Sequence, residues 1–215
     1  FTAVLMGLAS PLKSSHILWI NLITDSLPAL ALGADDNDAD SLMEKPPRDP
    51  KESLFADGGF LRTCFYGMLI AGISLAAFFT IPYGIMRERG IAFSPSAFAV
   101  ILQNEAVLGR AQTYAFTVLG MSQLFHAIGM RDVERSVFRM NHLQNRLMLL
   151  ALAAGFVLQI AVTEIPFLTA AFGTAHLSLR EWLRLLILAA FPLLAHELLV
   201  LLGGKGKGRK GESGR

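Results

Sequence analysis

The feature that most constrains this chain is a series of long apolar stretches separated by short charged segments. Four of them contain the roughly 20 residues that a helix needs to cross a bilayer. Backbone groups in lipid must satisfy their own hydrogen bonds, so such segments span the membrane as helices. The stretches are residues 1–9, 17–32, 59–86, 111–130, 147–168 and 182–202. The sequence therefore predicts an all-α, polytopic transmembrane helix bundle with about five complete spanning helices and a truncated N-terminal one.

Composition supports a membrane protein and excludes other classes. Apolar residues other than glycine make up 53% of the 215 residues, and charged residues only 17%. A soluble domain has about 45–50% apolar residues with glycine included, and about 25% charged residues. The formal net charge of +2 is too small to indicate a nucleic-acid partner. The single Cys64 excludes an internal disulfide and a multi-cysteine metal site.

The residues at the two ends of the chain indicate how it divides into a membrane domain and a tail. Residue 1 is Phe, and the opening "FTAVLMGLA" reads as the last turns of a hydrophobic helix, so we interpret the chain as a carboxy-terminal piece of a larger protein. The last residues are rich in glycine and basic residues and contain no large apolar side chain. We expect a transmembrane domain over residues 1–204 and a flexible basic tail over residues 205–215.

The basic residues predict the orientation of the helices. If successive stretches alternate in direction, thirteen of the 19 Lys and Arg residues fall on one side of the membrane and six on the other. Cytoplasmic connections carry the excess of Lys and Arg. We therefore expect an integral, multi-pass membrane protein that contacts the lipid bilayer and has its C-terminus in the cytoplasm.

The stretch at residues 17–32 carries an unexpected polar group in "NLITDSLPALALG". In an α-helix, Asn21, Thr24 and Asp25 project from one face, and they offer an amide carbonyl, a hydroxyl and a carboxylate. Such hard oxygen ligands suit calcium, magnesium or manganese. Pro28 lacks an N–H and frees a carbonyl one turn back, near this group. Insertion of an aspartate at a helix centre costs roughly 2.5–3.5 kcal/mol, which favours a functional role for Asp25.

Other polar residues in the apolar stretches have more than one interpretation. Gln123 offers a further carbonyl oxygen for a cation, and an interhelical hydrogen bond explains it nearly as well. The same structural alternative, a network that holds the bundle together, applies to Asn21 and Thr24. We interpret His126 and Gln159 as bundle contacts, and Glu164, His196 and Glu197 as groups solvated at the interface. A regulatory contact is the alternative for His196 and Glu197.

The acidic loop after residue 33 is not an EF-hand. Asp36, Asp38 and Asp40 have the opening spacing of such a loop. Ser41 stands where glycine is required, and Pro47 stands where glutamate is required. An acidic collar that attracts cations and an ordinary solvated loop remain as alternatives.

Two motifs give a specific resemblance. "LWINLITDSLPALALG" at residues 18–33 and the loop "MEKPPRDPKESLF" at residues 43–55 resemble the sixth transmembrane segment and following loop of P-type cation-transporting ATPases, most closely the calcium-pump branch. The resemblance covers about 40 residues strongly, and segment count extends it from the end of segment five through segment ten. It implies that Asn21, Thr24 and Asp25 coordinate the transported cation, and that Gln123 occupies the position of an eighth-segment ligand.

The resemblance also implies a function. The parent protein would use ATP to export Ca²⁺, or alternatively Mn²⁺, from the cytoplasm, while ATP and Mg²⁺ would bind cytoplasmic domains absent from this chain. No catalytic or cofactor-binding residue is expected here, and the missing N-terminal segments of the same chain are expected partners. A Na⁺ or H⁺ pump of the same superfamily is one alternative. A secondary transporter or channel subunit without ATP chemistry is another.

Overall fold

The computed structural model describes residues 2–34, 58–133, 135–140 and 145–210, and for residues 203–210 only the backbone. Within these ranges the chain forms helices and no strands. In order they are α1 (Thr2–Leu5), α2 (Ser14–Trp19), the π-helical η1 (Ile20–Asp25), α3 (Ser26–Gly33), α5 (Gly59–Glu88), α6 (Pro95–Ile101), α7 (Glu105–Met130), the 3₁₀ turn η2 (Val137–Arg139), α8 (Arg146–Glu164), α9 (Pro166–Phe172), α10 (Leu179–Ala189) and α11 (Phe191–Lys210).

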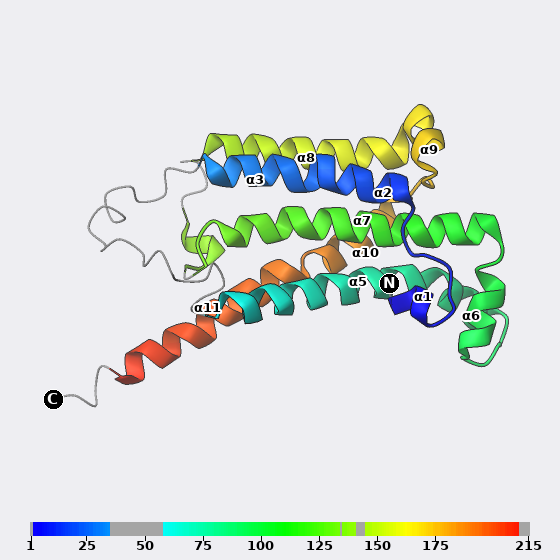
Figure 1. Ribbon diagram of the computed structural model, residues 1–215, viewed down its shortest axis with the longest axis horizontal. Coiled ribbons are helices and arrows are strands. Elements are labelled where there is room, and N and C mark those ends of the chain that lie inside the picture. Colours follow the sequence, from blue (N-terminus) through cyan, green and yellow to red (C-terminus); the bar gives the residue numbers. More distant parts are fainter. Residues whose placement is uncertain (1, 35–57, 134, 141–144, 211–215) are drawn as a thin grey trace.

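Helix α7 lies at the centre of the bundle (Figure 1). The run of α2, η1 and α3 lies beside α8 on one side of it, and α5, α10 and α11 lie on the other. Most of α7 is buried between residues 111 and 129. The neighbouring helices all pack against α7, which is therefore the central helix of the bundle.

Short polar caps fix where the central helices begin. Asn104 Oδ1 accepts hydrogen bonds from the N–H groups of Ala106 and Val107, at 3.0 and 3.2 Å, and so starts α7. Ser178 starts α10 through a capping box with Glu181. Such caps satisfy N–H groups that have no partner inside the helix. The helix starts therefore follow from local chemistry that is legible in the sequence.

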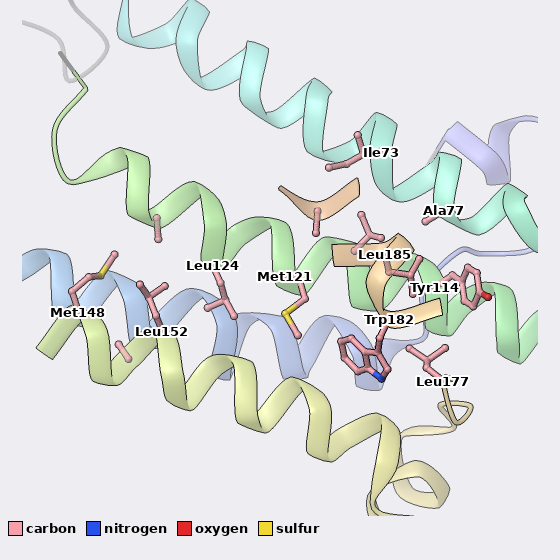
Figure 2. Packing of buried hydrophobic residues seen from close by; sticks show 14 of the residues in the cluster. Ile73, Ala77, Tyr114, Met121, Leu124, Met148, Leu152, Leu177, Trp182 and Leu185 are labelled. Atoms are coloured by element: carbon pink, nitrogen blue, oxygen red, sulfur yellow. The ribbon is translucent and has the colours of Figure 1, made fainter. Parts of the chain in front are cut away.

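The main core is formed where α5, α7, α8 and α10 meet. Figure 2 shows its side chains converging from these helices. Phe78 of α5 and Phe116 of α7, which belong to adjoining clusters, are both 0% exposed. The labelled members of the main core are Ile73, Ala77, Tyr114, Met121, Leu124, Met148, Leu152, Leu177, Trp182 and Leu185.

Glycines allow the closest approaches between these helices. A Cβ built on Gly155 of α8 would stand 2.7 Å from Leu124 of α7, and one on Gly129 of α7 would stand 2.9 Å from His196 of α11. Small residues at such points let helix backbones approach closely, as is common in membrane bundles. The two contacts fix α8 and α11 against α7.

The predicted number of spanning helices is not confirmed. In the described part of the chain, three helical segments are long and apolar enough to cross a membrane: Gly59–Glu88, Arg146–Glu164 and Leu179–Leu202. Helix α7 has sufficient length with 26 residues, but it buries polar side chains such as Gln112, Thr113 and Thr117, which lower its hydropathy. The stretch expected over residues 147–168 is divided, because α8 ends at Glu164 and Pro166 begins α9.

The predicted division of the chain is not tested. The boundary after residue 204 falls inside α11, which continues to Lys210. Residues 211–215 of the expected tail lie outside the described residues, as do the acidic loop and the Pro-Pro-Arg motif within residues 35–57.

Candidate cation site

The candidate site lies on a helix with an unusual central turn. Residues 14–33 form one continuous helical run, but residues 20–25 of it are π-helical. Pro28, one turn later, cannot donate the hydrogen bond that an α-helix requires at its position. Single π-helical turns inside α-helices occur frequently at functional sites. The polar residues Asn21, Thr24 and Asp25 all fall within this turn.

Thr24 is the buried member of the polar group. Its side chain is 1% exposed, and its hydroxyl lies 3.0 Å from the carbonyl oxygen of Ile20 and 3.1 Å from Oε1 of Gln123 on α7. A hydroxyl has a single hydrogen, so it donates to one of these oxygens at a time. The predicted interhelical hydrogen bond of Gln123 is therefore present, and it joins two of the predicted site residues.

Asp25 and Gln123 open into one cleft between η1, α3, α5 and α7. The cleft has a volume of about 560 Å³, and Thr24 also lines it. Among the described residues Asp25 has no ion pair, although Arg62 of α5 lines the same cleft. The structure thus brings together three of the four predicted ligands at one cleft, and within the part of the chain that it describes the carboxylate forms no ion pair.

Asn21 does not join them. Its side chain is exposed and is not among the residues that line the cleft, while its backbone carbonyl accepts a hydrogen bond of 2.8 Å from the Ser26 hydroxyl. The prediction of one shared face assumed α-helical winding. A π-helical turn contains more residues, so positions three and four apart are rotated relative to that expectation.

The rest of the cleft wall comes mainly from α5 and α7. Arg62, Thr63 and Tyr66 of α5 line it, together with His126 of α7. The rings of Tyr66 and His126 are in contact, with centroids 4.3 Å apart. The interpretation of His126 as a packing residue agrees with this contact.

A second cleft lies on the far side of Gln123. It also has a volume of about 560 Å³, and Ser10, Ile17 and Ser74 are among its lining residues. Gln123 is thus a wall residue of both clefts.

The helical run over residues 14–33, which carries the candidate site, is anchored at its start to the end of α9. Lys13 Nζ donates a hydrogen bond of 2.8 Å to the carbonyl oxygen of Gly173, and the Ser15 hydroxyl donates one of 3.3 Å to that of Phe172. His16 Nε2 lies 3.1 Å from the same Phe172 oxygen, and its ring stacks on Phe116 at 4.4 Å. Sequence reasoning missed this anchor, because nothing in the order of residues indicates that positions more than 150 apart meet.

Several polar residues expected at a solvated interface are instead engaged in contacts. Glu164 accepts hydrogen bonds from Trp182 Nε1 at 3.0 Å and from the Leu177 N–H at 3.3 Å, and it pairs with His176. His196 is 3% exposed and lies against Gly129 of α7.

Glu197 holds the connection between α7 and α8. It accepts hydrogen bonds from the Ser136 hydroxyl at 2.7 Å and the Val137 N–H at 2.6 Å. Interfacial solvation was a wrong interpretation of His196, which is buried, whereas Glu197 is partly exposed and also contacts the segment around the 3₁₀ turn.

The donor set restricts the chemistry of the site. Among the described residues no group of three or more His, Cys, Asp or Glu side chains is placed to hold a metal ion. Thr24, Asp25 and Gln123 supply one carboxylate and two neutral oxygens, a set that suits a hard cation. Calcium takes 6–8 oxygen ligands. These three side chains can therefore form only part of a calcium site.

Comparison with known proteins identifies the family. A family model described as "Cation transporting ATPase, C-terminus" matches residues 9–202. Calcium-transporting ATPase 1 of Bacillus cereus is 39% identical over 201 residues, which are 94% of this chain and 22% of that protein. The calcium-transporting ATPase of Bacillus subtilis is 34% identical over 199 residues, 92% of this chain and 20% of that protein. Calcium-transporting ATPase type 2C member 2 of Rattus norvegicus is 30% identical over 195 residues, 91% of this chain and 18% of that protein.

The chain therefore belongs to the cation-transporting ATPases and corresponds to their C-terminal membrane region. Its similarity to several calcium-transporting members confirms the resemblance to the calcium-pump branch of the P-type enzymes. The chain spans about a fifth of the length of these relatives.

Proposed function

We propose that this chain is the membrane portion of an ATP-driven pump that exports Ca²⁺ from the cytoplasm, and that Thr24, Asp25 and Gln123 supply part of its intramembrane cation site. The observation that carries the proposal is the cleft in which the Asp25 carboxylate opens beside the hydroxyl of Thr24 and the amide of Gln123. A carboxylate in a membrane segment is costly, and a bound cation offsets that cost.

The geometry supports a simple binding step. In the structure the Thr24 hydroxyl can direct its hydrogen to Gln123 or to the Ile20 carbonyl. When the hydrogen points to Ile20, the lone pairs of Thr24 and the Oε1 of Gln123 are both available to a cation near Asp25. The site thus changes from a hydrogen-bonded pair to two oxygen ligands by rotation of one hydroxyl.

The remaining ligands would come from the rest of the parent protein. Calcium needs more oxygens than these three side chains provide. Asn21 is included in the proposed ligand set on the family resemblance alone, and it would have to turn toward the cleft. ATP and Mg²⁺ would act on the cytoplasmic domains of the parent protein.

The proposed topology is multi-pass, with the C-terminus in the cytoplasm. The excess of Lys and Arg in one set of connections supports it. The many exposed large apolar side chains, such as Leu61, Met68 and Val157, support contact of the outer helix faces with lipid.

The test is a substitution of the carboxylate in the full-length protein. Asp25→Asn keeps the size of the side chain and removes its charge. Hydrogen bonds and contacts that involve a charged group contribute about 1.5–3 kcal/mol, so the half-saturating Ca²⁺ concentration of the ATPase should rise roughly 10- to 100-fold. Glu105→Gln, which neutralises an exposed carboxylate at the start of α7, is the matched control and should behave as wild type.

The same assay distinguishes the competing functions. Activation of wild type by Mn²⁺ at lower concentrations than Ca²⁺ would change the assigned cargo. Activation by Na⁺ or by pH alone would favour a monovalent pump. If Asp25→Asn retains the calcium activation of wild type, the proposed site is wrong.

A further inference from the structure

We propose that Gln159 of α8 is a positioning residue for the cation site, and that it acts by holding Trp19 at the start of the π-helical turn. The inference rests on the proposed function, because it concerns the affinity of the same site. Gln159 itself does not line the cleft. Its effect on a cation must therefore pass through the residues that it contacts.

The contact between the two helices is a hydrogen bond inside the bundle. Trp19 Nε1 donates to Gln159 Oε1 over 3.3 Å, and Gln159 is 0% exposed. Trp19 is the residue immediately before the π-helical turn that carries Thr24 and Asp25. A shift or rotation of Trp19 would therefore be transmitted directly to the residues of the turn.

The indole of Trp19 also contacts a second aromatic ring. It makes an edge-to-face contact with Phe172 of α9, with ring centroids 4.9 Å apart. The adjacent turn is tied to the same end of α9 through Lys13 and His16. Trp19 is thus held by two different elements, α8 and α9, and the hydrogen bond to Gln159 sets its orientation between them.

Gly120 of α7 shows how closely Gln159 approaches the site. A Cβ built on Gly120 would stand 2.9 Å from Gln159 Oε1 and 3.5 Å from Thr24 Cγ2. The absence of a side chain at this position allows the amide of Gln159 and the methyl group of Thr24 to approach the same point on α7. The π-helical turn, α7 and α8 therefore meet at Gly120, where Gln159 and Thr24 approach the same point on α7.

Stabilisation of the bundle does not by itself explain why residue 159 is a glutamine. Its Nε2 is buried and has no hydrogen-bond partner among the residues that the structure describes. A buried donor without a partner costs free energy that an apolar side chain of similar shape would avoid. The amide is explained by the acceptor that it presents to Trp19.

The experiment removes each half of the hydrogen bond in the full-length protein and measures calcium-dependent ATP hydrolysis. Gln159→Met keeps the length of the side chain and removes the acceptor, and Trp19→Phe keeps an aromatic ring beside Phe172 and removes the donor. We expect each to raise the half-saturating Ca²⁺ concentration about 5- to 10-fold, with a maximal rate within twofold of wild type. The double variant should show no larger shift than either single one.

Two further variants separate positioning from general packing. Gln159→Glu keeps an acceptor oxygen at the same reach, in a fully buried site that favours the uncharged carboxylic acid, and should retain an affinity close to that of wild type. Gln112→Met changes another buried glutamine of the bundle, which donates its hydrogen bond to the Ser10 carbonyl instead, and should leave the affinity unchanged.

The inference is wrong if Gln159→Met and Trp19→Phe bind Ca²⁺ as wild type does. It is also wrong if they lower only the maximal rate, or if Gln112→Met shifts the affinity equally. Should Gln159→Met fail to fold, Trp19→Phe decides the question alone, because its side chain is only partly buried. A wild-type ATPase that ignores Ca²⁺ would refute the proposed function together with this inference, whereas a calcium-dependent wild type with unshifted variants refutes this inference alone.

Discussion

Replacing Gly155 by alanine tests the packing of α8 against α7. The new Cβ would stand 2.7 Å from Leu124 Cδ2 and 3.1 Å from Cδ1, and Leu124 is 0% exposed, so it has no free space to enter. Overpacking of this kind costs about 1–3 kcal/mol. Alanine favours a helix over glycine by about 0.8–1.0 kcal/mol, which offsets part of that cost. We expect a net loss of about 0–2 kcal/mol in the free energy of unfolding.

The matched control is Gly72→Ala in α5. A Cβ at Gly72 would meet nothing within 4 Å, so only the gain in helix propensity applies. Unfolding of the purified full-length protein by SDS, followed by helical ellipticity, should place Gly155→Ala about 1–3 kcal/mol below Gly72→Ala, since this difference is the overpacking cost. Equal stability of the two variants would show that α7 and α8 are not in close contact at this point.

Three other substitutions probe the contacts that position the bundle, each read by the same denaturation unless stated. Gly129→Ala should unfold about 1–3 kcal/mol below the Gly72→Ala control, because its Cβ would meet the buried ring of His196 at 2.9 Å. Equal stability of these two variants would contradict this contact. Asn145→Ala should lower the free energy of unfolding by about 1–3 kcal/mol, because it removes the N-cap of α8 and leaves the carbonyl of Ala31 without its buried donor. A loss below about 0.5 kcal/mol, roughly the smallest effect of removing a cap, would refute both roles of Asn145. Glu197→Ala should increase proteolytic cleavage between α7 and α8 several-fold, because two hydrogen bonds hold that connection to α11, and an unchanged cleavage rate would show that they do not restrain it.

Much of the fold was predictable because it depends on local pattern. Apolar length predicted the regions of the helices, and caps such as Asn104 mark their starts in the sequence. The break at Ala190, between α10 and α11, was not predicted, because residues 182–202 form one long and largely apolar stretch and Pro192 alone gives no position for the break. The central role of α7 was also missed, since burial on all sides is a property of the assembled bundle.

The candidate site was predictable in its chemistry but not in its geometry. Charge and oxygen ligands within an apolar stretch pointed to Thr24 and Asp25, and the structure places both with Gln123 at one cleft. The structure does not place Asn21 at this cleft, because the prediction of one shared face assumed regular α-helical winding and residues 20–25 are π-helical. Gln159 was expected to hold helices together; that it does so through Trp19 required the positions of three helices at once.

The inward-facing polar side chains of α7 have a consequence for the order of assembly during synthesis. Gln112, Thr113, Thr117 and Ser122 are all buried by neighbouring helices, and in lipid alone they would be left without that cover. The segment should therefore enter the bilayer poorly by itself and be stabilised as a hairpin with α5, which precedes it and packs along it. Chains that stop before α8 and α10 are made would still leave part of these polar side chains uncovered.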